Sequence, residues 1–184
     1  PNAAGDRYYH YDSQGRIDYK IKAAPDSDGY RAFVNNYIGT ATVAATVDVY
    51  RSFTITDPRN PLFTDKKATQ YLDGAGKVVA EKYDSPNAEG DVYYHYDASG
   101  RVDIRFNGQP DADNCKAYRY TYAGDTEIVD SVTGYEDGDV TASPYNPRNA
   151  LLQNVKAALY HDAQGKTVAR INSVPDLDGY VYYH

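Results

Sequence analysis

The stretch PNAAGDRYYHYDSQGRIDYKI (Pro1–Ile21) recurs without gaps as PNAEGDVYYHYDASGRVDIRF (Pro86–Phe106), with 13 of 21 residues identical. A longer stretch, Pro58–His95, aligns in the same way with Pro147–His184, and 18 of these 38 positions are identical. Matches of this length at a fixed spacing are typical of an internal repeat. The chain is therefore predicted to contain one unit of sequence twice.

The two alignments differ in offset, and this difference predicts an insertion. The offset is 85 residues in the first alignment and 89 in the second. We expect the insertion around Thr133–Tyr145, because this segment is rich in Gly, Asp and Ser and is typical of an enlarged surface loop. The predicted organisation is a first copy over residues 1–85, a second copy over residues 86–174 and the start of a third over residues 175–184. Further repeats are expected to flank this segment or to be supplied by other chains.

A short signature, D-x-x-G-[RK], recurs four times and predicts tight turns between strands. Asp at the first position can cap backbone amides in a type I turn, and Gly at the fourth position accepts a positive φ. The glycines concerned are Gly15, Gly76, Gly100 and Gly165. The flanking residues alternate in polarity as strands do. Before the second-copy turn, Val92, Tyr94 and Tyr96 are predicted to share one face of a strand. After that turn, Val102, Ile104 and Phe106 are predicted to share one face, and Arg101, Asp103 and Arg105 the opposite face. In the first copy the corresponding apolar face consists of Ile17, Tyr19 and Ile21.

Composition and the remaining segments also favour β structure. The chain contains 21 Tyr but no Trp or Met, and Tyr suits half-buried strand surfaces. Thr40–Thr56 and Lys116–Tyr122 are expected to form further strands. Asn149–Tyr160 has helix-compatible periodicity, but its aligned segment carries Pro61, so we expect strand or irregular structure for most of it, with one short helix as the alternative. The predicted class is all-β: tandem hairpins stacked into a rod or an open β-sheet spiral, with little helix.

The segments YYHYDSQGRI and VYYHYDASGRV resemble the YD repeat of the RHS family, whose motif is Y-x-Y-D-x-x-G-R followed by an aliphatic residue. The matching residues are Tyr9, Tyr11, Asp12, Gly15, Arg16 and Ile17, and Tyr94, Tyr96, Asp97, Gly100, Arg101 and Val102. YLDGAGKV and YHDAQGKT match in part, with Lys in place of Arg. The resemblance implies a large cell-surface or secreted protein in which hairpins coil into a β-sheet shell or rod, in some members around a toxin.

Charge and motifs argue against several classes of function. The net charge of -7 disfavours binding to nucleic acid and to anionic membranes, and no segment approaches the roughly 18 consecutive apolar residues of a membrane helix. No G-x-S-x-G, H-E-x-x-H or P-loop motif is present, so we expect no enzyme and assign no catalytic, cofactor-binding or metal-binding residue.

The single Cys115 is expected to be a small loop residue. His10, His95 and His184 share one repeat position and are expected to be half-exposed strand residues.

Three acidic turns raise the question of calcium. PDSDGY (Pro25–Tyr30), PDADNC (Pro110–Cys115) and PDLDGY (Pro175–Tyr180) place carboxylates two residues apart. They lack the third oxygen residue and the bidentate Glu of a calcium loop, and Asp-Gly turns without metal are common. We therefore expect no cofactor.

Three functions are compatible with these features. The first is a structural repeat segment that forms a rod or filament at the cell surface or outside the cell, by head-to-tail self-association through Tyr8, Tyr9, Tyr182 and Tyr183 or as a continuous array. The second is a glycan-binding module in which strand tyrosines such as Tyr93 and Tyr183 stack on sugar rings. The third, implied by the resemblance, is part of a toxin-enclosing shell.

Overall fold

The computed structural model describes residues 2–3, 5–57, 59–141, 147–176 and 178–184. The chain divides into two compact units, Pro1–Ser85 and Pro86–His184. Residues 175–184, which are expected to begin a third copy, lie in the second unit. Residues 142–146 of the predicted insertion lie outside the described part of the chain.

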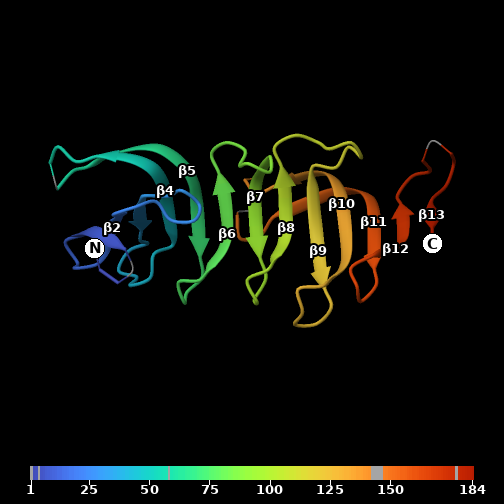
Figure 1. Cartoon of the computed structure of the whole chain (residues 1–184), viewed down its shortest axis with the longest axis horizontal. Helices are drawn as coiled ribbons and strands as arrows, with labels where there is room; N and C mark the ends of the chain where they lie inside the picture. Colours follow the sequence, from blue (N-terminus) through green and yellow to red (C-terminus); the bar gives the residue numbers. More distant parts are fainter. Residues whose placement is uncertain (1, 4, 58, 142–146, 177) are drawn as a thin grey trace. The chain divides into compact units, whose positions relative to one another are not determined.

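In each unit, strands that follow one another in the chain pair antiparallel (Figure 1). The first unit contains β1 (Asp6–Tyr11), β2 (Ile17–Lys22), β3 (Ala32–Asn36), β4 (Thr46–Thr54), β5 (Leu62–Leu72) and β6 (Val78–Tyr83). The second contains β7 (Asp91–Tyr96), β8 (Val102–Asn107), β9 (Ala117–Tyr122), β10 (Val129–Asp139), β11 (Leu151–His161), β12 (Thr167–Asn172) and β13 (Tyr182–Tyr183). The described residues include no helix, so the all-β prediction is confirmed. Accordingly, no helical segment in the described residues has the length and apolarity needed to cross a membrane.

Each unit buries side chains that come from successive strands. In the first unit the core cluster consists of Tyr30, Phe33, Val47, Val49 and Ala68, with Leu72 and Tyr83 packed against it. In the second unit the buried apolar residues are Tyr93, Ile104, Phe106, Cys115, Ala117 and Val140. Alternate side chains of a strand point to the same face, as Ile104 and Phe106 of β8 do. Tyr30, Cys115 and Val140 lie in the connections between strands.

The register of the β7–β8 hairpin decides which tyrosine is buried. Tyr93 pairs with Phe106 and Tyr94 pairs with Arg105. Tyr93 therefore shares the buried face of Phe106, whereas Tyr94 lies on the half-buried face. The register shifts between His95 and Tyr96, and this bulge interrupts the simple alternation along β7.

The alternative of a short helix within Asn149–Tyr160 is wrong, because Leu151–His161 is the strand β11. β11 pairs with β10 along most of its length, and this ladder of backbone hydrogen bonds overrides the helical periodicity of the sequence. The strand expected in Lys116–Tyr122 is observed as β9. Within the segment Thr40–Thr56, which is expected to be a strand, only residues Thr46–Thr54 form one, β4.

The inserted residues lie after β10, and the prediction that Thr133–Asp139 belongs to a loop is wrong. Residues 55–61 connect β4 to β5, whereas residues 140–150 connect β10 to β11, a connection longer by four residues. This difference equals the difference between the two sequence offsets. The glycines of the segment are needed for packing: a Cβ on Gly134 would lie 2.7 Å from the Cys115 Sγ, and one on Gly138 would lie 2.6 Å from the Phe106 Cζ.

Candidate functional site

The four signature turns share one hydrogen-bonding pattern, which the Asp97 turn illustrates. The Gly100 amide donates to the Asp97 carbonyl oxygen at 2.9 Å, and the Asp97 Oδ1 accepts the Arg101 amide at 2.9 Å. The fourth-position glycines all have positive φ: Gly15 78°, Gly76 82°, Gly100 90° and Gly165 77°. The turn prediction is thus confirmed, with the geometry of a type I turn followed by a left-handed residue.

In the second unit the arginine of the signature forms a cluster that we call the arginine clamp. The Arg101 Nε and Nη2 lie 2.8 and 2.7 Å from the Asp97 Oδ2. The Arg101 Nη1 donates to the carbonyl oxygens of Gly124 at 2.9 Å and Thr126 at 2.5 Å, and the guanidinium lies 4.3 Å from the ring centroid of Tyr122. The clamp therefore joins the β7–β8 turn to the end of β9 and the loop that follows it.

The first unit contains the same clamp at the same repeat positions. Arg16 bonds to Asp12, donates to the carbonyl oxygens of Gly39 and Ala41, and lies 4.2 Å from the ring centroid of Tyr37. Hydrogen bonds from the Arg16 amide and guanidinium hold the pKa of Asp12 below its ordinary value, although burial acts in the opposite direction. A Lys ammonium is a compact point charge and cannot reproduce this planar set of bonds, so we expect Lys77 and Lys166, which take the place of Arg in the other two signatures, not to form the same clamp.

Sequence reasoning missed the partners of the clamp arginines. Arg16 and Arg101 were visible as part of the turn signature, but the loop carbonyls that they bind lie 23 and 25 residues away. One signal was available: Tyr37 and Tyr122 are separated by 85 residues, as are Arg16 and Arg101. A shared offset of this kind indicates side chains that belong to one repeated contact.

Two of the three periodic histidines bond to an aspartate on the neighbouring strand. The His10 Nδ1 lies 2.7 Å from the Asp18 Oδ1, and the His95 Nδ1 lies 2.5 Å from the Asp103 Oδ1. The His10 ring also stacks on Tyr19, with 4.7 Å between ring centroids. These histidines are half-buried strand residues, as expected, whereas His184 is exposed.

A buried polar cluster in the first unit surrounds Glu81. The Glu81 carboxylate accepts hydrogen bonds from the hydroxyls of Tyr83 at 3.0 Å and Tyr30 at 3.4 Å and from the Gln70 amide at 3.2 Å. Burial raises the pKa of Glu81, and the hydrogen bonds from Tyr83 and Gln70 offset this only in part. The residues at the same repeat positions in the second copy are Arg170, Asn172, Cys115 and Leu159, so this cluster is not part of the repeated scaffold.

Replacing Glu81 with Gln is expected to raise the melting temperature at neutral pH, because it removes a charge that burial disfavours. The folded chain binds the Glu81 proton more tightly than the unfolded chain does, since the folded-state pKa is raised above its ordinary value of 4.5. The stability that this group contributes is fully present below the unfolded-state pKa and is lost as the pH rises through the folded-state pKa. Melting curves of wild type and E81Q should therefore nearly coincide at about pH 4 and separate as the pH increases.

Glu127→Gln provides the control for this pH series, because Glu127 is exposed. Its melting temperature relative to wild type should stay nearly constant over the same range. An advantage of E81Q that shrinks toward neutral pH would contradict the assignment.

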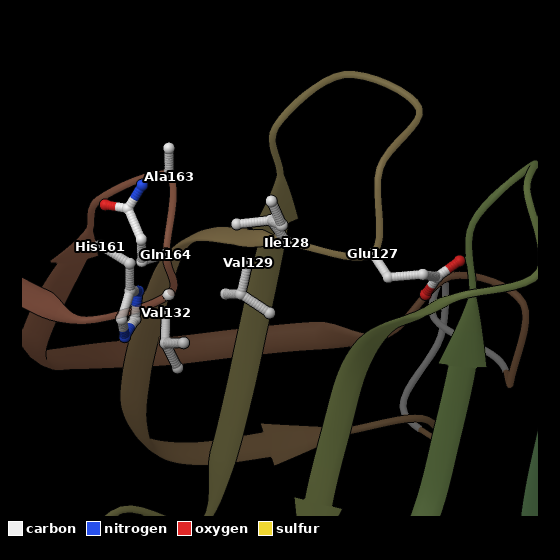
Figure 2. Close-up of a pocket in the computed structure, with 8 residues that line it drawn as sticks. Glu127, Ile128, Val129, Val132, His161, Ala163 and Gln164 are labelled. Carbon is white, nitrogen blue, oxygen red and sulfur yellow. The ribbon is translucent and has the colours of Figure 1, made fainter.

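Two surface pockets of the second unit combine apolar and polar side chains. One, of about 510 Å³, has a floor of Ile128, Val129 and Val132 between His161 on one side and Glu127 on the other (Figure 2). The His161 Nδ1 is buried and has no hydrogen-bond partner in the described part of the chain. The other pocket, of about 300 Å³, is lined by three tyrosines, two carboxylates, an arginine and two valines: Tyr94, Tyr120, Tyr122, Glu89, Asp91, Arg105, Val102 and Val129. We call the second one the tyrosine pocket.

The tyrosine pocket contains a buried carboxylate. Asp91 is 2% exposed and accepts a hydrogen bond of 2.6 Å from the Tyr94 hydroxyl. Burial and this bond together raise the pKa of Tyr94 to about 12. The first copy has Asp6, Tyr9 and Tyr37 at the repeat positions of Asp91, Tyr94 and Tyr122, but it has Ala4 and Asn35 at those of Glu89 and Tyr120, so only these last two side chains give the pocket a lining specific to the second copy.

The structure changes the roles expected for some tyrosines and acidic turns. Tyr93 is 1% exposed and cannot stack on a sugar ring, so its expected role in glycan contact is wrong, whereas Tyr183 is exposed. The first carboxylates of the acidic turns, on Asp26, Asp111 and Asp176, accept backbone amide hydrogen bonds. In the described residues no group of three or more His, Cys, Asp or Glu side chains is placed to hold a metal ion.

Cys115 is buried against Gly134, and burial raises the pKa of its thiol.

No known protein-family model matches this chain, and no curated protein matches its sequence. The candidate sites of the chain are the repeated arginine clamps, the Glu81 cluster and the two pockets of the second unit.

Proposed function

We propose that the chain is a structural segment of an extracellular or cell-surface protein in which β-hairpins stack into a rod. The arginine clamp carries this proposal, because it occurs at the same repeat position in both units. Each clamp connects the turn of a hairpin to the loop that follows the strand after that hairpin. Arg16 makes this connection in the first unit, to the loop after β3, and Arg101 makes it in the second, to the loop after β9. Repeated contacts between sequence neighbours are typical of arrays whose stability is summed over repeats. In this proposal the chain has no catalytic role.

The resemblance to YD repeats supports the same proposal from the sequence. The Asp, Gly and Arg of the YD motif are the residues that form the turn and the clamp. They therefore act in the scaffold and not in a reaction. The family's surface and secreted members support the proposed location.

A chain with one more period tests the rod. A further copy of residues 86–174, placed between residues 174 and 175, is expected to increase the maximum dimension in small-angle X-ray scattering by about half, because two periods become three. The cross-sectional radius should stay unchanged. An increase in cross-section, or scattering typical of flexibly linked beads, would contradict the proposal.

The tyrosine pocket supports a second candidate function, glycan binding. Aromatic rings beside carboxylates offer both a stacking surface and hydrogen-bond acceptors for a sugar, and Tyr120 and Glu89 are specific to the second copy. Retention on polysaccharide gels that Tyr120→Ala abolishes and Tyr11→Ala preserves would support this function. If no polysaccharide gel retains the chain, glycan binding is excluded and the structural role is the remaining proposal.

A further inference from the structure

The end of the second unit presents a set of exposed apolar side chains, on both faces of β12 and β13 and in their connection. Its members are Val168, Ile171, Val174, Tyr180, Val181, Tyr182 and Tyr183, and we call it the β13 surface. β13 pairs with β12 on one edge, through Ile171–Tyr182 and Arg170–Tyr183. In the described residues its other edge has no strand partner. Exposed apolar side chains beside a free strand edge are typical of a surface that accepts another strand.

The internal repeat shows what covers the same surface elsewhere in the chain. Tyr182 lies 89 residues after Tyr93, yet Tyr182 is 52% exposed whereas Tyr93 is 1% exposed. Tyr93 is covered by Phe106 of β8, with 4.9 Å between the ring centroids. In the first unit the equivalent residue, Tyr8, is half-buried and stacks on a different residue of the following strand, Tyr19 of β2, with 5.8 Å between the ring centroids. At this repeat position, therefore, the following strand of the hairpin provides the cover.

His184 adds a hydrogen-bonding requirement to this surface. Its equivalents His10 and His95 bond to Asp18 of β2 and Asp103 of β8. His184 is exposed, and β12, the strand paired with β13, places no Asp opposite it. A strand of the β2 or β8 type would bring the missing aspartate.

We infer that the β13 surface binds a β-strand with the sequence pattern of β2 and β8. In this pattern the residues follow in the order aliphatic, Asp, apolar, basic and apolar. The strand adds antiparallel to the free edge of β13, places an aromatic or aliphatic side chain on Tyr182 and bonds its Asp to His184. β1 of a second copy is not the occupant, because β1 is itself the equivalent of β13. This inference rests on the proposed stacking of hairpins and specifies the partner that stacking requires.

A peptide with the sequence of residues 97–109 is the probe. Its fluorescence anisotropy is measured against the full 184-residue chain, and saturable binding with one peptide per chain is expected. Tyr182→Ala should weaken binding about tenfold or more, since an aromatic contact at a strand interface carries much of the affinity. Tyr11→Ala is the matched control, because Tyr11 is also an exposed tyrosine but lies on β1. Binding should be unchanged in this variant.

A double-mutant cycle tests the predicted hydrogen bond between His184 and the Asp of the added strand. Asp103→Asn in the peptide should weaken binding to the wild-type chain but should have little further effect on the His184→Ala chain. Equal effects of the peptide change on both chains would overturn the assignment of His184. Equal binding by the Tyr182→Ala and wild-type chains would overturn the β13 surface as the docking site.

A strand linked covalently to the chain provides a second test, because a free peptide that forms no strand in solution can fail to bind for that reason alone. A copy of residues 96–107 is added directly after His184, and hydrogen exchange of the Tyr182 and Tyr183 amides is measured. Slowing to the rates of Tyr93 and Tyr94 is expected, whereas unchanged exchange overturns the inference. If docking fails while the chain with an additional period lengthens as a rod, the structural proposal stands and only the partner is wrong.

Discussion

Replacing Tyr93 with alanine is expected to lower the free energy of unfolding by about 3–5 kcal/mol, the range for removing a large aromatic side chain from a core. Tyr93 is 1% exposed, and its ring packs on Phe106. Its hydroxyl also donates a 2.7 Å hydrogen bond to the Pro147 carbonyl oxygen, which would lose its partner. Urea denaturation of the wild type and the variant measures the difference.

The repeat supplies a matched control for this prediction. Tyr182 has the same repeat position and the same sequence neighbours, Val on one side and Tyr and His on the other, but it is 52% exposed. Tyr182→Ala should cost less than about 1 kcal/mol. Similar losses for the two variants would show that Tyr93 is not a core residue and that the register of the β7–β8 hairpin is wrong.

Replacing Gly100 with valine is expected to cost about 1–3 kcal/mol, the energy of forcing a β-branched residue into a left-handed backbone conformation. Gly100 has a φ of 90°, and at the same turn position in the first copy a Cβ built on Gly15 would meet no atom within 4 Å. The cost should therefore arise from the backbone alone and not from a clash. Thermal melting of the variant and the wild type tests this expectation.

The Asp73 turn provides a control in which only the position of the glycine changes. Gly74 precedes Gly76 in that turn, has no positive φ and also has open space around a built Cβ. Gly74→Val should melt close to the wild type, and Gly76→Val should lose stability as Gly100→Val does. If Gly100→Val melts with the wild type, the turn assignment is wrong, and with it the basis of the YD resemblance.

The arginine clamp shows how far the sequence could lead toward a site. The spacing of Asp97, Gly100 and Arg101 predicted the turn, because these residues interact with one another within five positions of the chain. The same spacing could not predict that Arg101 also binds the carbonyls of Gly124 and Thr126, because backbone carbonyls carry no sequence signal. The tyrosine pocket and the Glu81 cluster were hidden for a related reason: their members come from several strands.

By itself, the sequence determined the all-β class, the duplication and the glycine turns of the four signatures, because these depend on alternation and on contacts between close neighbours in the chain. Only the tertiary structure excluded the alternative of a short helix in Asn149–Tyr160 and decided that Gly134 and Gly138 lie within β10, because pairing and packing across strands overrode local composition. It also decided the environment of each tyrosine. Tyr93 and Tyr182 occur in the same local sequence, and they differ in burial because β8 covers one and no strand in the described residues covers the other.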